Sequence, residues 1–409
     1  MIADADINAL NTWITQAGLN GLAEDALVTG FCERCRDMGL PVSRALVLID
    51  TLHPVYEGRL FRWGHDPSQP SFVEYGRTVA PEGLVLGAEE ERAAASWRAS
   101  PFFHMLQTGE TVMRLTEAHT AWFPVMQDYI AAGMKGGASI VNRFAAEGVI
   151  GEMDAVYSTW MTTHRGGFSE PDLAVLERLV LTLALAVKTA ALTRMTGTLM
   201  ETYLGRDAAR RVLSGRIMRG VADQIDAAIW FSDLRGFTRV TDSAPEQVIP
   251  LLNDYADVIV SAIHANGGDV LKLIGDGILA IFTTGDRGRC CSCALDAAMA
   301  ARTDVMALNA RRYDGGLPVT DMYLGLHVGD VFYGNIGSME RLDFTVVGPA
   351  VNEASRIATM CRSVEQPMLV SEAFAKVDGM RDRLVSVGRY ALRGVERPQE
   401  LFTLERGSA

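Results

Sequence analysis

Two apolar segments that each stop at an acidic residue restrict the fold of this chain more than any other feature. In "IWFSDLRGFT", the apolar residues 229–231 lead through Ser232 to Asp233, and an Arg and a Gly then break the pattern. In "DVLKLIGDGILAIF", two apolar runs flank the turn at residues 275–277, which predicts a β-hairpin with Asp276 at its tip. If these strands pair in one sheet, the two carboxylates meet at its edge.

Asp233 and Asp276 are candidate metal ligands. Carboxylate oxygens suit Mg²⁺, which prefers to share its coordination with substrate phosphates. Two metal ions held in this way activate an attacking oxygen and stabilise a leaving one. The alternative is that Asp233 caps a turn and that Asp276 is a type I′ turn residue. Either acid alone favours that alternative, but the pair, each after an apolar strand, favours metal binding.

A third segment, "LDFTVVGPAVNEASRIATMC", joins a strand to a helix. The strand is predicted at residues 343–347, and Pro349 opens the helix after Gly348. Asn352 and Arg356 are four residues apart and therefore share a helix face. An amide and a guanidinium side by side can orient a hydroxyl and bind a phosphoryl group. Taken singly, they could equally belong to a solvated helix face.

Length and composition predict two domains. The chain has 409 residues, of which 48% are hydrophobic, and this is enough to bury two cores. The formal net charge of -12 argues against nucleic-acid partners and anionic membranes, because both need a face rich in Lys and Arg. An anionic ligand would therefore need locally placed cations or a metal.

The sequence predicts a cytoplasmic protein without a membrane span. The start "MIADADINAL" has no basic residues followed by an apolar run, so no signal peptide is predicted. The longest apolar stretch, residues 179–192, contains Lys188 and is shorter than the ~20 residues that a span needs. Six cysteines in this length do not form a disulfide framework, which fits a reducing compartment.

Two groups of cysteines lie close together in the sequence. Cys32 and Cys35 are three apart in "FCERC", and Cys290, Cys291 and Cys293 form "CCSC". A zinc site would need four ligands with a second pair at matching spacing, and no second CxxC or His pair is present. Ordinary buried thiols are therefore favoured over metal or redox use.

The N-terminal part is predicted to mix helices and strands. Helical periodicity covers residues 22–38, and residues 43–51 read as a strand that a turn at His53-Pro54 joins to a second strand within 52–63. Helices are predicted at about 88–107 and 121–133, and residues 138–144 and 149–160 are predicted to pair as a hairpin.

Ser169 is predicted to cap the next helix, whose first turn holds Glu170, Pro171 and Asp172. Its apolar residues alternate steps of three and four, which is a heptad pattern shorter than three heptads. The pattern fits a dimer contact and, equally well, a helix packed on its own domain. The residues concerned are Leu173, Leu176, Val180, Leu183, Val187 and Ala190.

This mixed sheet closed by an exit helix after "GFSEPDL" resembles the GAF family of small sensor domains, over roughly residues 20–192. The resemblance implies a regulatory domain and a small-molecule ligand. An aromatic cluster could line the ligand pocket or, more commonly, form core. His104 as a haem or metal ligand is a weaker reading. The cluster comprises Trp97, Phe102, Phe103, His104, Trp122 and Phe123.

The second half resembles the catalytic domain of the class III nucleotidyl cyclases. The matching segments, in order over residues 224–405, are "FSDLRGFT", "GGDVLKLIGDGILAIF", "LGLHVGDVFYGNIG", "DFTVVGPAVNEASR" and "YALRGVERPQELF". Several long motifs in one order are far more specific than any single one. The resemblance implies a ferredoxin-like α/β domain that works as a homodimer with its active sites at the interface.

The same resemblance assigns roles to individual residues. It makes Asp233 and Asp276 the ligands of two Mg²⁺ or Mn²⁺ ions per site, and Asn352 and Arg356 the pair that supports the transition state. Arg393 stands where the family usually has a phosphate-binding Lys, and it keeps the charge with a different geometry. Gly236 would let backbone N–H groups approach the phosphates. The substrate contacts are Lys272, Thr345, Phe237, Thr238 and Arg393.

The residues that face the base favour ATP over GTP. Adenine offers a ring acceptor and amino donors, which suit a Lys272 donor beside a Thr345 acceptor, whereas guanine would call for an acid at position 272. Many adenylyl cyclases have Asp where this chain has Thr345, which places it in the branch that uses Thr. The commoner family sequence at this point is "GDAVN", and Pro349 stands in place of its Asp. A carboxylate next to the site is therefore missing.

The expected protein is an adenylate cyclase, a phosphorus-oxygen lyase that converts ATP to cyclic AMP and pyrophosphate. The expected fold class is α/β (α+β): a GAF-like mixed α/β sensor domain over 1–192, a helical linker over 193–220 and a ferredoxin-like cyclase domain with an antiparallel-rich sheet over 221–409. The alternatives are a guanylate cyclase and a catalytically silent cyclase-like binding module. "GGDV" at 267–270 resembles the diguanylate cyclase signature only superficially, because its Glu-Phe ending is absent.

Overall fold

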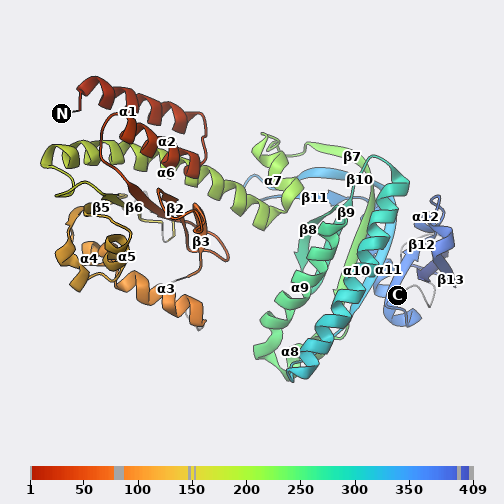
Figure 1. Cartoon of the computed structure of the whole chain (residues 1–409). Coiled ribbons are helices and arrows are strands. Elements are labelled where there is room, and N and C mark those ends of the chain that lie inside the picture. The colour runs from red at the N-terminus through yellow and green to blue at the C-terminus, as the bar shows by residue number, and fades with distance from the viewer. Residues whose placement is uncertain (1, 78–86, 146–148, 152, 394–397, 405–409) are drawn as a thin grey trace. The chain divides into compact units, whose positions relative to one another are not determined.

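The computed structural model describes residues 2–77, 87–145, 149–151, 153–393 and 398–404. The chain divides into two compact units, residues 1–199 and 200–409, which Figure 1 shows with their elements labelled. Each unit has its own sheet and its own hydrophobic cores.

The N-terminal unit is built on a six-stranded sheet in the order β3-β2-β1-β6-β5-β4, in which every neighbouring pair is antiparallel. The predicted hairpin of residues 138–144 and 149–160 is present as β5 and β6, and residue 152 lies outside the described residues. The strands are β1 (Arg44–Asp50), β2 (Gly58–Trp63), β3 (Phe72–Tyr75), β4 (Val112–Leu115), β5 (Gly136–Arg143) and β6 (Ala155–Thr162).

Helices cover both faces of this sheet (Figure 1). On one face α1 (Asp4–Leu19), α2 (Glu24–Asp37) and α6 (Glu170–Leu204) enclose a core in which Phe31 meets Trp160 edge to face, with ring centroids 5.2 Å apart. On the other face a smaller core includes Phe102 and Tyr157. The elements on that side are α3 (Ala88–Arg98), α4 (Pro101–Thr108), the 3-10 turn Glu117–Ala121 and α5 (Val125–Ala131).

The heptad pattern of α6 packs within the N-terminal unit. Ser169 caps the helix as predicted, since its hydroxyl accepts a hydrogen bond from the Asp172 N–H. Leu176, Val180 and Leu183 are almost fully buried against α1, α2 and the sheet. The apolar face that could have formed a coiled coil is therefore buried inside the N-terminal unit. Packing of the helix on its own domain accounts for the pattern.

The C-terminal unit is built on an eight-stranded sheet in the order β13-β14-β12-β10-β7-β9-β8, with β11 paired to β10. Its neighbours are antiparallel except for the parallel pair β10–β12. The strands are β7 (Ala222–Leu234), β8 (Gly268–Ile274), β9 (Gly277–Phe282), β10 (Met322–Gly337), β11 (Leu342–Val347), β12 (Met368–Ser371), β13 (Leu384–Tyr390) and β14 (Gln399–Leu404).

The two faces of this sheet bury different cores. Trp230 and Phe282 pack under α9 (Val248–Ala265) and α10 (Arg287–Asp314). Ile229 and Phe344 face the opposite side, where α11 (Pro349–Val364) and α7 (Arg206–Leu213) lie. The unit also contains α8 (Phe237–Ser243), α12 (Glu372–Ala375) and the 3-10 turns Pro245–Gln247 and Arg381–Arg383. The predicted fold class, a mixed α/β protein with antiparallel-rich sheets, is confirmed.

One helical stretch in the described part of the chain, Pro245–Ala265, is long and apolar enough by length and composition to cross a membrane. It corresponds to the turn before α9 and α9 itself. Leu251, Tyr255 and Ile259 on this helix are buried against the sheet. Its apolar character is therefore used in the core of the C-terminal unit.

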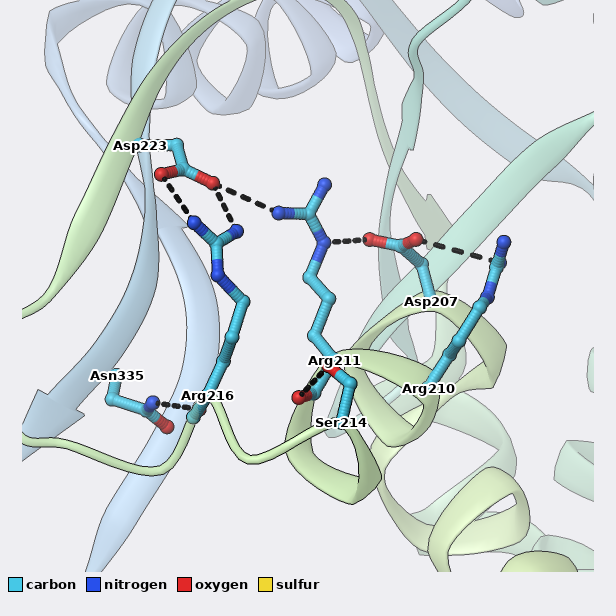
Figure 2. Close-up of polar contacts among 7 residues, drawn as sticks. All are labelled: Asp207, Arg210, Arg211, Ser214, Arg216, Asp223 and Asn335. Carbon is cyan, nitrogen blue, oxygen red and sulfur yellow. Dashed lines mark hydrogen bonds and ion pairs between the residues drawn. The ribbon is translucent and has the colours of Figure 1, made fainter.

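The segment between the two sheets is mostly helical. The long helix α6 extends to Leu204, and α7 follows after Gly205. Polar contacts then fasten α7 and the following loop to β7 and β10 (Figure 2). Asp223 on β7 accepts hydrogen bonds from Arg211 at 2.9 Å and from both terminal nitrogens of Arg216, and the Asn335 side chain donates to the Arg216 carbonyl.

Candidate active site

The structure brings Asp233 and Asp276 to one edge of the C-terminal sheet. Asp233 is the second-last residue of β7, and Asp276 lies in the turn between β8 and β9. Because β9 pairs with β7, with Ser232 opposite Ile278, the turn lies beside the end of β7. The Leu234 N–H donates to Asp276 Oδ2 at 3.3 Å. The predicted meeting of the two acids is therefore observed.

The electrostatics of this pair fit a cation site. Burial, and then the charge of Asp276, raise the pKa of Asp233 to about 6. Asp233 Oδ1 is buried and has no hydrogen-bond partner among the described residues. A buried carboxylate oxygen without a donor is costly, and a bound cation would remove that cost.

Glycine keeps the turn close to the end of β7. A Cβ at Gly277 would lie 2.9 Å from the Ser232 carbonyl oxygen, so a larger residue would push the turn away from Asp233. No group of three or more His, Cys, Asp or Glu side chains suited to a metal occurs in the described part of the chain. A magnesium ion on these two acids would therefore complete its coordination with substrate phosphates, backbone oxygens or water.

Lys272 and Thr345 lie on neighbouring structural elements, β8 and β11. Lys272 Nζ forms an ion pair with Asp343 Oδ2 at 2.7 Å, and both side chains are about two-fifths exposed. Asp343 and Thr345 are two residues apart and share a face of β11, while Phe344 between them is buried on the other face. The ammonium group is thus held on the face of β11 that carries Thr345.

Sequence reasoning missed the role of Asp343. The signal was available in the alternation of "LDFTVV", which places residues 343 and 345 on one face and residue 344 on the other. The sequence could not predict the pairing of β11 with β10. This pairing brings Asp343 within reach of Lys272, which is 71 residues away in the sequence.

Asn352 and Arg356 project from α11 as the sequence predicts. Gly348 precedes the helix and Pro349 is its first residue. Asn352 is exposed and Arg356 is half-buried, and no hydrogen bond or ion pair joins either of them to another described residue. Both are therefore available to a ligand.

Close packing fixes the position of α11. A Cβ at Gly325 of β10 would lie 2.5 Å from both the Ala354 carbonyl oxygen and the Ala358 nitrogen. The helix backbone therefore rests directly on the strand backbone. This contact sets the height of Asn352 and Arg356 above the sheet.

Within one chain the candidate residues form three groups. Asp233 shares a face of β7 with Ile229, which packs on the side of the sheet that α11 covers. Burial, and to a smaller extent the charge of Asp233, raise the pKa of the Cys361 thiol on that helix. Among the described residues, no hydrogen bond or ion pair links the two acids to Lys272, Asn352 or Arg356. The acids, the Lys272–Asp343 pair and the α11 pair are thus not joined to one another by polar contacts among the described residues.

The other predicted substrate contacts lie at the start of α8 and at Arg393. Gly236, in the left-handed conformation with φ 70°, turns the chain into α8, where Phe237 packs against the helical core and Thr238 is exposed. Arg393 is exposed. Residues 394–397 of the motif "YALRGVERPQELF" lie outside the described residues.

The aromatic residues singled out in the N-terminal unit divide between two cavities. Trp97 and Phe102 border a cavity of about 700 Å³. The other four residues border a second cavity of about 410 Å³, and they are Phe103, His104, Trp122 and Phe123. The cluster therefore does not surround one site. Cys32 and Cys35 are buried in the core, and burial raises the pKa of both thiols.

Residues 221–406 match the family model of the adenylate and guanylate cyclase catalytic domain. An adenylate cyclase of Anabaena cylindrica is 34% identical over 162 residues, which cover 38% of this chain and 32% of that protein. Adenylate cyclase 1 of Rhizobium meliloti (strain 1021) is 28% identical over 178 residues, which cover 42% of this chain and 26% of that protein. The match thus spans about a third or less of each relative's length.

Solved structures of cyclases are similar to part of this chain. The adenylyl cyclase CyaB from P. aeruginosa has a TM-score of 0.42 and 24% identity, covering 45% of this chain and 96% of that one. The guanylyl cyclase Cya2 has a TM-score of 0.40 and 27% identity, covering 46% of this chain and 96% of that one.

Proposed function

We propose that this chain, whose residues 221–406 match the family model of the adenylate and guanylate cyclase catalytic domain, converts ATP to 3′,5′-cyclic AMP and pyrophosphate. The observation that carries the proposal is the edge of the sheet at Asp233 and Asp276, where a buried carboxylate oxygen has no hydrogen-bond partner among the described residues. The retained Lys272, Thr345, Asn352 and Arg356 support a working enzyme rather than a silent binding module.

Asp233 and Asp276 would hold two Mg²⁺ or Mn²⁺ ions per site. When bound, such ions lower the pKa of the ribose 3′-hydroxyl and neutralise charge on the triphosphate. The two carboxylates supply negative charge at the sheet edge, and the close approach at Gly277 keeps them together.

Other side chains would bind and orient the nucleotide. Lys272 donates a hydrogen bond to the adenine ring nitrogen, and the Thr345 hydroxyl accepts one from the adenine amino group. Asn352 orients the ribose, and Arg356 donates to the α-phosphate, where charge grows as pyrophosphate leaves. Arg393, Phe237 and Thr238 complete the substrate contacts.

The site would be shared between the two chains of a homodimer. The two acids would come from one protomer, and Lys272, Thr345, Asn352 and Arg356 from its partner, related by a two-fold axis. The lack of any hydrogen bond or ion pair between the two acids and the other four residues, among the described residues of one chain, supports this arrangement.

ATP is favoured over GTP because position 272 is a lysine. A guanine-specific site would need an acceptor there, since guanine presents N–H donors where adenine presents an acceptor. Thr345 supports the proposal that the chain belongs to the Thr-type adenine-selecting branch. The relatives from Anabaena cylindrica and Rhizobium meliloti are adenylate cyclases, which agrees with this choice, whereas the solved structure of Cya2 is that of a guanylyl cyclase.

The N-terminal unit would act as a GAF-like sensor that regulates the cyclase domain. Its layered sheet and its cavity of about 700 Å³ suit a small ligand. The proposed limits are residues 1–192 for the sensor, 193–220 for the linker and 221–409 for the cyclase domain.

The test is to incubate the purified chain with ATP or GTP and with Mg²⁺ or Mn²⁺, and to quantify both cyclic nucleotides. We expect cyclic AMP from ATP, with GTP used far less well, and no product from Asp276→Asn. Product formation by Asp276→Asn would contradict the assignment of Asp276 as a metal ligand. A preference for GTP would support the guanylate cyclase alternative, and no product from either nucleotide would favour the silent module.

A further inference from the structure

The larger cavity of the N-terminal unit has the size of a small-molecule site. Its volume of about 700 Å³ lies within the roughly 300–1,000 Å³ that is usual for such sites. Leu48, Leu60 and Val73 line it from the sheet, and Trp97 and Phe102 line it from the helices. The middle of the cavity is therefore apolar on both sides.

The two ends of the cavity carry opposite charge. On β1, Leu46, Leu48 and Asp50 share one face by strand alternation. Leu46 pairs with Arg62 of β2 at one end, and Asp50 pairs with Gly58 at the other. These ends are four residues apart, which is about 13 Å along a strand. The cavity thus has a cationic end and an acidic end.

The protein's own groups occupy the acidic end. The Tyr75 hydroxyl donates to Asp50 Oδ1 at 2.5 Å. This bond passes over Gly58, where a Cβ would lie 2.1 Å from the Tyr75 hydroxyl oxygen. The absence of a side chain at position 58 therefore lets the phenol reach the acid.

The cationic end lacks a matching anion. Arg62 donates to the Pro70 carbonyl at 3.2 Å, and no carboxylate in the described part of the chain forms an ion pair with it. Burial lowers the pKa of Arg62, and the neighbouring Tyr129 acts in the opposite direction. A partly buried guanidinium without a counter-ion is an unfavourable arrangement that an anionic ligand would relieve.

Tyr129 on α5 borders the same cationic end. Its side chain is only 6% exposed, and among the described residues its hydroxyl has no hydrogen-bond partner. Burial raises the pKa of Tyr129 to about 12, although the charges of Arg44 and Arg62 act in the opposite direction. The phenol is therefore a protonated donor beside Arg62.

We propose that this cavity binds a small apolar organic acid, whose carboxylate accepts hydrogen bonds from Arg62 and Tyr129. The apolar body of the acid fills the space between Leu48 and Leu60 on one side and Trp97 and Phe102 on the other. A cationic ligand would meet the charges of Arg44 and Arg62. A neutral ligand would leave the guanidinium without an anion.

The test compares two probes of equal chain length, octanoate and octan-1-ol, by calorimetric titration of the full chain. We expect octanoate to bind at least about tenfold more tightly, which corresponds to about 1.4 kcal/mol. Arg62→Gln should remove this preference, and Tyr129→Phe should weaken octanoate binding while leaving octan-1-ol binding unchanged. Arg36→Gln, an exposed arginine of α2 outside the cavity, is the matched control.

A filling variant locates the binding. Leu60→Trp places a larger ring in the cavity and should abolish binding of both probes, with folding checked by circular dichroism. Equal affinity of the wild-type chain for the two probes would overturn the proposal. So would octanoate binding that survives in Leu60→Trp or keeps its full strength in both Arg62→Gln and Tyr129→Phe.

An effect of the bound organic acid on cyclic AMP formation rests on the proposed function. The binding of that ligand to the cavity does not. The same titration on the Asp276→Asn chain separates the two, because that variant should bind octanoate normally without producing cyclic AMP. Loss of octanoate binding in the wild-type chain contradicts the cavity assignment alone. A wild-type chain that binds octanoate normally but forms no cyclic AMP contradicts the proposed function alone.

Discussion

Asp233 is a residue whose chemistry conflicts with the stability of the folded chain. Its carboxyl group is partly buried next to a second acid, and one of its oxygens has no partner among the described residues. A raised pKa means that folding disfavours the ionised form, so the charge destabilises the fold at neutral pH. Function, rather than packing, explains an acid at this position.

Replacing Asp233 with Asn should separate activity from stability. We expect Asp233→Asn to lower cyclic AMP turnover by at least about a hundredfold, because a charged metal ligand is lost. In EDTA the same variant should have a higher Tm, since the neutral amide avoids repulsion from Asp276. Turnover and Tm of the two chains provide the measurement, with the exposed Asp304→Asn as control.

Two outcomes would count against this account of Asp233. Retained turnover in Asp233→Asn, or in the companion variant Asp276→Asn, would remove the metal-ligand assignment. A lower Tm in EDTA would mean that the Asp233 carboxylate makes a stabilising contact in the folded chain.

Lys272 and Asp343 allow base recognition to be tested apart from the ion pair. Lys272→Glu turns the donor that faces the base into an acceptor, so kcat/KM for ATP should fall far more than for GTP. Asp343→Asn removes the ion pair but keeps the donor. The pair is about two-fifths exposed and contributes at most about 1 kcal/mol to stability, so Tm should hardly change.

The ratio of kcat/KM for ATP to that for GTP is the measured quantity in both variants. We expect it to collapse in Lys272→Glu and to stay within about threefold of wild type in Asp343→Asn, a change below 1 kcal/mol. An unchanged ratio in Lys272→Glu would mean that Lys272 does not read the base.

At the level of elements, the seating of α11 on β10 positions two of the proposed catalytic side chains. The contact depends on Gly325, since any side chain there would collide with the helix backbone at Ala354 and Ala358. Neither neighbour can move aside as a flexible side chain could. The helix itself must shift.

Gly325→Ala should therefore reduce both stability and activity. Overpacking of this kind costs about 1–3 kcal/mol, and displacement of α11 would misplace Asn352 and Arg356. Denaturant unfolding and cyclic AMP turnover are the measurements. Gly197→Ala is the control, because its Cβ would meet open space in α6 and should stabilise the helix slightly. Normal turnover in Gly325→Ala would show that the position of α11 is not critical.

The contacts of Figure 2 fasten a second element, the loop between α7 and β7. Asp223 is the central acceptor, and its hydrogen bonds from Arg216 lower the pKa of its carboxyl group. Arg211, which also donates to Asp223, lies over the Tyr333 ring, and Tyr333 in turn contacts Phe344 on β11. The loop is thus joined to the strand that carries Thr345.

Asp223→Asn should release this loop. The loss of a charged acceptor weakens its bonds to Arg216 and Arg211, so we expect trypsin to cut faster after Arg216 and Arg219, which are exposed. Cleavage rates by mass spectrometry are compared with those of Asp304→Asn, which lies on α10 away from the loop. Equal rates in the two variants would show that Asp223 does not hold the loop.

For the whole molecule, the proposed sharing of sites between chains makes a quantitative prediction. Asp276→Ala and Arg356→Ala should each be inactive as pure dimers. In a mixed dimer one site collects both changes and the other collects neither. If pairing is random, about half of the dimers are mixed and half of their sites are intact, so activity should recover to about one quarter of wild type.

Cyclic AMP production after subunit exchange between differently tagged variants is the measurement. Pull-down through both tags in succession confirms that mixed dimers are present. If mixed dimers form and activity does not return, each chain builds its own site and the shared-interface proposal is wrong.

Local sequence patterns predicted most elements of this protein. Alternation and turn residues located β8 and β9 around Asp276, and the Gly348-Pro349 start located α11 with Asn352 and Arg356 on one face. These predictions succeed because strand and helix periodicity and turn chemistry act between residues that are close in the sequence. The meeting of Asp233 and Asp276 at one sheet edge could be predicted because each of them follows an apolar strand.

Tertiary structure alone decided the contacts between distant segments. The heptad pattern of α6 left dimer contact and self-packing equally open, and only the cores of the N-terminal unit settled it. The pairing of Lys272 with Asp343 needed β11 to be placed beside β10, and the division of the aromatic cluster needed the helices to be placed over the sheet. Such contacts depend on how elements pack, which periodicity within one element cannot specify.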